Sequence, residues 1–332
     1  MKSFAGSDSS ESISVASFRP APAPIPLVIL AGADARPTRL PRRAATDHRP
    51  VAGYKGATLR IGGRTLISRL VERLEGCGAF GPILIAGPAR VYRGPSTRVP
   101  VIDTDVSFDG NVRLAIETVQ AEHPGAPVAF ITCDVLPTHE ELVQLIALYR
   151  EDPGSSIWCP GVRVPEDRVG LGAFAWKPGY RLRVGPEAIV TMLPGHFAVV
   201  RPAGLRLRFL YRLARVAYRS RNRSIRFRRR FMIAQLLPHL WFQDGLELLA
   251  LRPPTFTYSV VRHGWAAARA FREGALAVTE LEAILTRMAV KSRYLERHPE
   301  ASVRIPIVDL QGLAFDIDTE EEARQLGVEP TS

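Results

Sequence analysis

Short apolar runs and amphipathic segments alternate along the first 150 residues, and this alternation constrains the fold more than any other feature. IPLVILAG (25–32), GPILIAG (81–87) and APVAFITCD (126–134) are mostly apolar, as in strands that are buried on both faces of a sheet. Residues 64–77 and 138–151 instead place apolar residues at helical spacing. This alternation predicts an α/β fold with a Rossmann-like, mostly parallel sheet flanked by helices.

The middle of the chain departs from this pattern. Apolar runs over 188–202 are compatible with one or two strands, whereas 203–250 looks mainly helical and is rich in arginine. A further helix is predicted over 278–297. We therefore expect a basic, mainly helical insert over 203–297 within the α/β domain.

The C-terminal residues carry two more strand candidates, SVRIPIVDL (302–310) and LAFDIDT (313–319), followed by a helix, EEEARQLG. Candidate site residues occur near both ends of the chain, and they need a common crevice. We therefore predict that 300–318 pairs into the sheet begun by 25–32. The domain would then extend over residues 25–332.

The first residues are rich in Ser, Pro and Ala, which predicts a disordered leader over 1–24. This leader has early acids and lacks the apolar core of a secretory signal. The sequence also lacks a run of about 18 apolar residues that would predict a transmembrane helix. Cys77, Cys133 and Cys159 have no zinc-ligand spacing, and an odd, scattered set is typical of a reducing compartment. We therefore expect a cytoplasmic protein.

The formal net charge of +11 is concentrated in one segment. Residues 201–230 hold 12 Arg and neither Lys nor acid, so the rest of the chain sums to about −1. This local basicity lacks regularly interleaved aromatic residues, which makes nucleic acid an unlikely partner. Apolar residues between the arginines of 204–243 fit helices on an anionic membrane surface. They fit equally an arginine-rich lid over a site or a solvated face on the core.

Gly32 follows the first strand, where a glycine lets the backbone approach a phosphate closely. Arg36, Arg39 and Lys55 come later in the same loop, and such cations suit a triphosphate. A single glycine after a strand also fits a plain turn. Ligands of open α/β sheets bind beyond the carboxyl ends of the strands, which is where this loop is expected.

Asp134 follows the strongest strand candidate, VAFITC. A carboxylate at this position can hold Mg²⁺, which prefers oxygen ligands and needs only one or two protein carboxylates beside phosphate oxygens. The alternative is an Asp that caps a turn before the next helix, which has the capping-box pair Thr138 and Glu141.

Asp316 and Asp318 would point to one face if LAFDIDT is a strand. Two like charges on one face repel each other unless a cation lies near, so a metal or phosphate site is plausible there. In the alternative reading, Asp318 or Thr319 caps the last helix.

Four segments in this order resemble the MobA-like nucleotidyltransferases, which have a glycosyltransferase-A (GT-A) type fold. The segments are LAG (30–32), Lys55 with GATLRIGGRTLISRLVERL, FITCDVLPTHEEL, and FDIDTEEEARQL. The resemblance covers about residues 25–150 and 300–327, and the middle is only loosely similar to longer members with a helical insert.

The resemblance implies a role for each matching residue. Ala31 and Gly32 would lie against the nucleotide, and Lys55 would contact phosphate. Asp134 would hold Mg²⁺, and Asp318, supported by Asp316, would supply the second ligand. By the same resemblance, Asn111 would lie near the nucleotide.

The chain departs from the family pattern in its first loop. Ala33 replaces the usual second glycine, and either Arg36 or Arg39 would stand for the family arginine. The proline after Asp134 is shifted by one position. These departures concern the nucleotide loop most and bear on whether the enzyme is active.

The resemblance implies an Mg²⁺-dependent enzyme that transfers a nucleoside monophosphate from an NTP to a phosphorylated small-molecule acceptor and releases pyrophosphate. One alternative is a GT-A type glycosyltransferase that uses a nucleotide sugar. Those enzymes carry a D-x-D motif in mid-domain, whereas the D-I-D of this chain lies near the C-terminus. The other alternative is a non-catalytic protein that binds anionic surfaces. Among the seven histidines, His196 in LPGHF is the one that could reach an acceptor, although it also fits a structural role.

Overall fold

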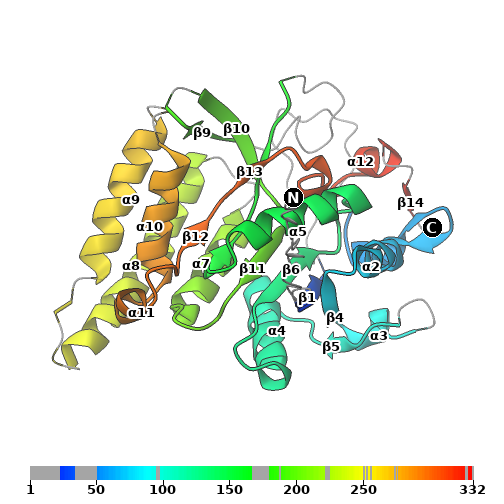
Figure 1. Ribbon diagram of the computed structural model, residues 1–332, viewed down its shortest axis with the longest axis horizontal. Helices are drawn as coiled ribbons and strands as arrows, with labels where there is room; N and C mark the ends of the chain where they lie inside the picture. The colour runs from blue at the N-terminus through cyan, green and yellow to red at the C-terminus, as the bar shows by residue number, and fades with distance from the viewer. Residues whose placement is uncertain are drawn as a thin grey trace, which may run out of the picture.

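The computed structural model describes residues 23–33, 51–94, 98–166, 179–186, 188–220, 225–249, 251, 253–254, 256–272, 274, 276–325 and 328–330. Most of the predicted leader, 1–24, lies outside the described residues. Arg36 and Arg39 also lie outside them. In Figure 1 a central sheet has helices on both faces, and a further group of helices stands at one end of the molecule.

A seven-stranded sheet forms the centre of the molecule (Figure 1). Its strands, in chain order, are β1 (Ile25–Leu30), β4 (Phe80–Gly87), β5 (Val101–Asp103), β6 (Val128–Thr132), β7 (Ile157–Trp158), β11 (Phe197–Val200) and β12 (Val303–Arg304). Their order in space is β12-β7-β11-β6-β1-β4-β5. Only β11 runs antiparallel to its neighbours, β6 and β7. The sheet is mostly parallel, as the sequence predicts.

Helices cover both faces of this sheet, which explains why its central strands are mostly apolar. Leu27 and Ile29 of β1 belong to one core, together with α2 (Leu66–Cys77) and α5 (His139–Glu151). Val28 and Leu30 point the other way and pack with α4 (Phe108–Glu122). Because successive strand residues face opposite sides, β1 is buried along its whole length.

The ends of the two helices on the first face follow from local sequence. Thr138 and Glu141 form the predicted capping box at the start of α5. Gly78 ends α2 with a φ of 65°, a left-handed conformation that glycine adopts without strain. These caps determine where α5 begins and where α2 ends, and both helices pack against the central sheet.

Two smaller sheets flank the central one. The first has the order β13-β8-β10-β9, with β8 (Gly161–Arg163), β9 (Tyr180–Val184), β10 (Ala188–Pro194) and β13 (Ile307–Val308). The second has the order β14-β2-β3, with β2 (Leu59–Ile61), β3 (Arg64–Thr65) and β14 (Val328–Pro330). The segment 188–202, predicted to hold one or two strands, contributes β10 and β11.

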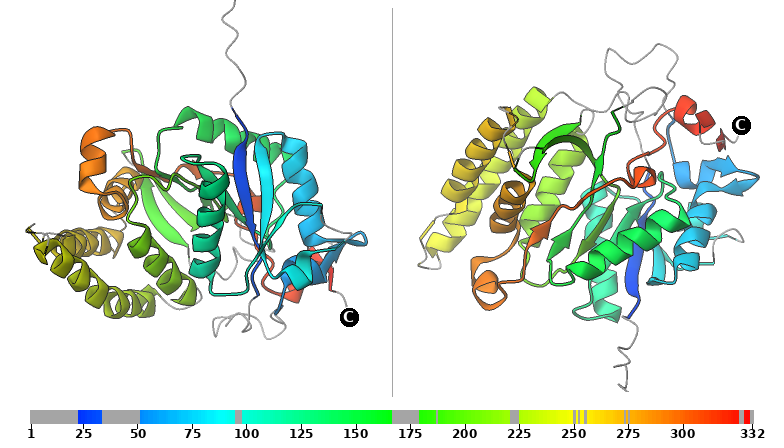
Figure 2. Two further views of the ribbon diagram at one scale, coloured as in Figure 1. Left: turned by 90° about the horizontal axis from the view of Figure 1, so that it is seen from below. Right: turned by 45° about the horizontal axis from the view of Figure 1, so that its top comes forward.

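A group of helices follows β11 and stands at the end of the molecule away from α2 (Figures 1 and 2). It consists of α7 (Leu207–Ser220), α8 (Ile225–Leu249), α9 (Phe256–Arg272), α10 (Val278–Ala289) and α11 (Ser292–Arg297). The helix predicted over 278–297 is thus two helices, because Val290 is extended between them. Within the described part of the chain, no helix is long and apolar enough to cross a membrane. The remaining short helices are α1 (Lys55–Thr58), α3 (Ala89–Tyr92), η1 (Gln311–Leu313) and α12 (Glu320–Gln325).

The C-terminal strand prediction is right in part and wrong in part. β12 joins the central sheet beside β7, whereas β13 pairs with β8 in the smaller sheet. Residues 314–318, in the predicted strand LAFDIDT, form a loop without regular structure instead. The reason is that this segment bonds to loops rather than to a strand ladder. The N–H of Ile317 donates to the carbonyl of Asp134, and the carbonyl of Asp318 accepts from Val51.

Side chains of helix α10 accept hydrogen bonds from residues at the start of the C-terminal segment. The carboxylate of Glu282, 8% exposed, accepts the N–H of Ile305 at 2.6 Å and a guanidinium N–H of Arg304 at 3.0 Å. Thr286 accepts the N–H of Val303 at 2.8 Å. The helical group therefore holds the chain that returns to the central sheet.

Replacing Glu282 with Ala should lower the free energy of unfolding by about 1–3 kcal/mol, because a buried N–H of Ile305 would lose its acceptor. Glu282→Gln should cost less, since its amide oxygen can still accept that hydrogen bond. Urea unfolding followed by circular dichroism measures both variants. Equal losses in the two variants would show that the acceptor at this position does not matter.

Candidate active site

Asp134 lies two residues beyond β6, at the carboxyl edge of the central sheet. The N–H of Cys133 donates to the carbonyl of Leu30, so the pairing of β6 with β1 continues up to the residue before Asp134. The carbonyl of Asp134 accepts the N–H of Ile317 at 3.0 Å. The backbone of Asp134 is thus held from both sides, while its side chain stays 18% exposed.

Asp316 and Asp318 approach Asp134 from the loop that follows η1. One carboxylate oxygen of each residue lies within 4.8 Å of the corresponding oxygens of the other two. Asp316 is 4% exposed and Asp318 is 1% exposed. The structure therefore brings the three predicted acids together, and two of them come from a loop rather than from the predicted strand. We refer to these residues as the carboxylate cluster.

The cap of α12 leaves the side chain of Asp318 available to the cluster. Glu322 accepts the N–H groups of Asp318 and Thr319 at 2.7 and 2.8 Å, and Thr319 accepts the N–H of Glu322 at 3.2 Å. Thr319 and Glu322 thus form a reciprocal capping box. Of the two caps considered for this helix, the structure uses Thr319.

Lys55 opens α1 and places its ammonium group against the carboxylate cluster. Its Nζ lies 2.7 Å from Oδ1 of Asp318 and 3.7 Å from Oδ2 of Asp134, and the residue is 3% exposed. Gly56 makes this approach possible, because a Cβ there would lie only 3.1 Å from the Cβ of Cys133. The glycine lets α1 pack against the end of β6 and directs Lys55 into the site.

The site holds more acids than bases. Three carboxyl groups lie around one ammonium group in a mostly buried location. Burial opposes the ionisation of Asp134, but the charges of Lys55 and His196 favour it, and together they hold its pKa below the ordinary 3.8. Asp134 is therefore ionised at neutral pH and can serve as an oxygen ligand.

His196 lies beside the cluster, in the turn between β10 and β11. Its Nδ1 is 3.0 Å from Oγ1 of Thr132, and its Nε2 is 3.5 Å from Oδ2 of Asp316. Its backbone N–H donates to the carbonyl of Leu313 at 2.7 Å. The imidazole therefore joins the end of β6 to the loop that bears Asp316.

The predicted nucleotide loop begins at the same edge of the sheet. Ala31 is fully buried and donates its N–H to the carbonyl of Ala86 at 2.9 Å. Gly32 follows, and a Cβ on it would lie 2.8 Å from Nδ2 of Asn111. Asn111 is 4% exposed and accepts a hydrogen bond from Thr104 at 2.9 Å. Gly32 and Asn111 are thus neighbours, although they are far apart in the sequence.

Sequence reasoning missed an exposed polar network next to Lys55. Oδ2 of Asp105 accepts from Tyr54 at 2.9 Å and from Arg90 at 2.6 Å, and Arg90 also donates to Tyr54 at 2.7 Å. The hydrogen bonds from Arg90 and Tyr54 lower the pKa of Asp105. The sequence feature that could have revealed this network is the position of Asp105, just beyond β5 at the carboxyl edge of the sheet.

Sequence reasoning also missed an ion pair that links the basic segment to helix α4. Arg215 of α7 donates two hydrogen bonds to Oδ2 of Asp109, at 2.9 and 2.6 Å. Burial opposes the ionisation of Asp109, but hydrogen bonds from Arg215 and Ser107 outweigh it and lower its pKa. At least one arginine of the 201–230 stretch therefore stabilises the helix that carries Asn111.

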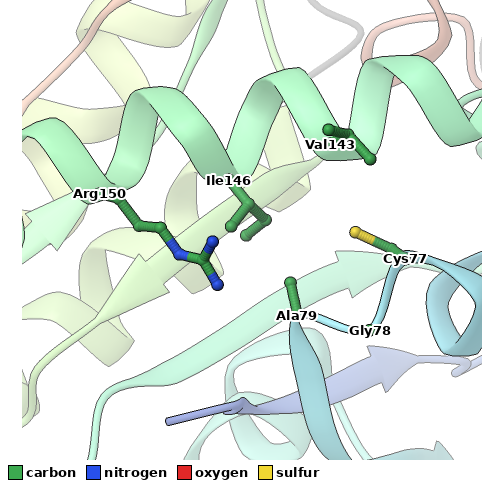
Figure 3. Close-up of a pocket in the computed structure, with 6 residues that line it drawn as sticks. All are labelled: Cys77, Gly78, Ala79, Val143, Ile146 and Arg150. Atoms are coloured by element: carbon green, nitrogen blue, oxygen red, sulfur yellow. The ribbon is translucent and has the colours of Figure 1, made fainter. Parts of the chain in front are cut away.

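A separate hollow of about 200 Å³ lies between the end of α2 and α5, lined by Cys77, Gly78, Ala79, Val143, Ile146 and Arg150 (Figure 3). Ile146 and Arg150 point from α5 toward Ala79 in this view. Burial raises the pKa of the Cys77 thiol, so the thiol is protonated at neutral pH and is a weak nucleophile. None of the residues that line this hollow belongs to the carboxylate cluster.

A match to a protein-family model distinguishes between the three classes considered from the sequence, which are a nucleotidyltransferase, a glycosyltransferase and a non-catalytic protein. The model of the MobA-like NTP transferase domain matches residues 27–230, which is more than half of the chain. The chain belongs to this family. It is therefore an enzyme of the nucleotidyltransferase class, and the α/β fold predicted from its sequence is confirmed.

A comparison with solved structures finds several that are similar to this NTP transferase domain. A hypothetical transferase from Thermus thermophilus gives a TM-score of 0.54 at 18% identity, over 90% of this chain and 99% of its own. CMP:2-keto-3-deoxy-manno-octonic acid synthetase complexed with CTP gives 0.39 at 13% identity, over 67% and 86%. HddC from Yersinia pseudotuberculosis complexed with GMP-PN gives 0.37 at 16% identity, over 56% and 79%. A search of curated proteins returned no significant match.

Replacing Lys55 with Met should destabilise the NTP transferase domain at neutral pH by about 3–5 kcal/mol, because buried carboxylates would lose their cation. The carboxyl pKa values would then rise above those of the unfolded chain, so acidification should restore part of the stability. Added Mg²⁺ should also restore it, by replacing the lost positive charge. Urea unfolding between pH 5 and 8, with and without Mg²⁺, measures these effects.

The wild type should not gain stability on acidification between pH 5 and 8. Because the pKa of Asp134 is lowered in the folded state, its stabilising effect is present above the ordinary 3.8 and is lost as the pH falls through the lowered value. Lys291→Met removes an exposed lysine and serves as the matched control. A Lys55→Met variant that is equally unstable at pH 5 and 8, and insensitive to Mg²⁺, would refute this account of the site.

Proposed function

We propose that this enzyme transfers a nucleoside monophosphate from an NTP to a phosphorylated small-molecule acceptor, with Mg²⁺ as its metal ion. The observation that carries the proposal is the convergence of three carboxylates and Lys55 at the carboxyl edge of the sheet. Open α/β sheets bind their ligands at this edge. Family membership gives the class of reaction, the chemistry of the site supports the metal, and the resemblance described above suggests the acceptor.

The residues of the cluster fit Mg²⁺. Their donor atoms are all carboxylate oxygens, which this hard cation prefers. Oδ1 of Asp134 is buried and accepts no hydrogen bond from any residue that the structure describes, so it is available to a ligand. Asp134 and Asp318 would hold the ion, with Asp316 in support. The bound ion would neutralise charge that develops on the phosphates.

The reaction requires positioning and charge stabilisation more than covalent catalysis. An oxygen of the acceptor phosphate would bond to the α-phosphorus of the NTP as the bond from that phosphorus to the bridging oxygen breaks, and pyrophosphate would leave. Lys55 would stabilise the negative charge on the reacting phosphates as a point charge. No protein nucleophile is needed for this displacement.

The nucleotide would lie along the loop after β1. Gly32 offers a backbone surface without a Cβ, and Asn111 faces it with an amide nitrogen. Arg36 and Arg39, which lie outside the described residues, would contact the phosphates from the same loop. Ala31 would lie against the nucleotide at the start of this loop.

We infer that the catalytic domain extends over 25–332 rather than ending with the family match at 230. Asp316 and Asp318 lie beyond that limit, yet they complete the carboxylate cluster. The helices over 203–297 would then be an insert within one domain, as the sequence predicts.

Asp134→Ala should lower the rate of pyrophosphate release by a factor on the order of 10² or more, since the loss of one well-placed electrostatic group commonly has such an effect. Folding should be nearly intact, because this side chain faces the site rather than the core. Asp318→Ala should show a similar loss, and Asp316→Ala a milder one. Asp309→Ala is the matched control, because Asp309 is 71% exposed on the same C-terminal segment.

The substrates can be found by measuring pyrophosphate release with the four NTPs against a panel of phosphorylated sugars and alcohols. Full activity of Asp134→Ala with the cognate NTP and Mg²⁺ would refute the metal assignment. Release of a nucleoside diphosphate from a nucleotide sugar, without pyrophosphate release from any NTP, would instead establish glycosyl transfer. A wild type that neither turns over nor binds any NTP would refute the proposed function. Ala33 would then be the first residue to replace with glycine, the residue usual in the family.

A further inference from the structure

The outer surface of α8 and α9 exposes large apolar side chains. Trp241 and Phe242 of α8 are 62% and 61% exposed, and Tyr258 and Trp265 of α9 are 66% and 65% exposed. Apolar side chains gathered on one surface mark a site of interaction with another molecule. We call this surface the aromatic face, and its members are Trp241, Phe242, Leu248, Leu249, Leu251, Tyr258, Val261 and Trp265.

The aromatic face is distinct from the side of these helices that packs inward. Leu240 of α8 and Phe256 and Val260 of α9 are buried in a core of their own with Phe209. Tyr258, Val261 and Trp265 follow one another at spacings of three and four residues, which places them on one side of α9. Figures 1 and 2 show that α8 and α9 stand at the end of the molecule away from α2 and β14.

The turn between the two helices is the most exposed part of this surface. Leu249 and Leu251 are 83% and 96% exposed where α8 ends. Asp244 accepts the N–H groups of Phe256 and Thr257 at 3.0 Å each, which fixes the start of α9 against α8. The leucines are therefore presented by a helical hairpin that is already held in place.

Charge distinguishes between the possible partners of the aromatic face. Residues 225–272 hold eight arginines but only two acids, and one of these acids, Asp244, is buried. Arg262 and Arg269 are exposed on α9 beside Tyr258 and Trp265. Contact between two copies through this face would bring two segments of net positive charge together, whereas an anionic surface would neutralise that charge.

We propose that the aromatic face docks this enzyme on the surface of an anionic phospholipid membrane. Tryptophan and tyrosine favour the boundary between headgroups and acyl chains, and arginines at the same level attract anionic lipids. Leu249 and Leu251 would enter the acyl region at the tip of the hairpin. The docking surface is thus the aromatic face, within 241–265, rather than the stretch 204–243 for which the sequence left membrane contact as one alternative. α7 is held against the body of the protein by Arg215 and by buried apolar residues.

Co-sedimentation with vesicles tests this proposal on the full chain. Vesicles of phosphatidylglycerol and phosphatidylcholine should bind the wild type at low salt, and vesicles of phosphatidylcholine alone should bind it weakly. The double variant Trp241→Ser/Trp265→Ser should bind the anionic vesicles less tightly by a factor on the order of ten or more, because two apolar side chains are lost from the contact. Ile189→Ser removes an exposed apolar residue from β10 and should bind like the wild type.

Three outcomes would overturn the proposal. The first is a wild type that does not bind anionic vesicles at low salt, and the second is a double variant that binds as tightly as the wild type. The third is a wild-type dimer, seen by light scattering, that becomes monomeric in the double variant, because the partner would then be a second copy. Vesicle binding does not depend on catalysis, so these results are independent of the proposed function.

Discussion

The attraction between Lys55 and the acids around it is the interaction on which the site depends. Asp316 and Asp318 are almost completely buried, and Asp134 lies within a few ångströms of both. Like charges in such a location repel strongly because little water screens them. The ammonium group, 2.7 Å from Asp318, offsets part of this repulsion. The carboxylate oxygens that remain are ligands of the kind that a hard cation prefers.

Backbone hydrogen bonds, rather than a strand ladder, carry the C-terminal acids to this location. Ile317 donates to the carbonyl of Asp134, and the carbonyl of Asp318 accepts from Val51. His196 ties the same loop to β10 and β11 through its bond to Leu313. These bonds lie between residues that are distant in the sequence, so each one restricts how the two ends of the chain can meet. The geometry of the acids is therefore a product of the whole fold.

The sequence predicts the parts of the fold that are determined locally. β1, α2, β6 and the capping box at Thr138 follow from apolar runs, helical spacing and side-chain chemistry. The loop over 314–318 could not be predicted in this way, because an apolar-polar alternation becomes a strand only if a neighbouring strand is free to pair with it. The same holds for the pair of Asp109 and Arg215, since nothing near either residue indicates its partner. For α8, the sequence predicts a helix that mixes arginines with apolar residues. Which side of this helix faces outward depends on its packing against α7 and α9.

The two hydrogen bonds of Glu141 bear on the order in which parts of the chain fold during synthesis. One of its carboxylate oxygens caps α5, and the other accepts the N–H of Gly312 at 2.8 Å, just before the loop that bears Asp316 and Asp318. The first 150 residues leave the ribosome long before this loop is synthesised. A growing chain therefore exposes Asp134 and Lys55 without their two C-terminal partners. All four charged groups come together only when this loop has reached its place beside Glu141, so a segment synthesised long after Asp134 completes the cluster.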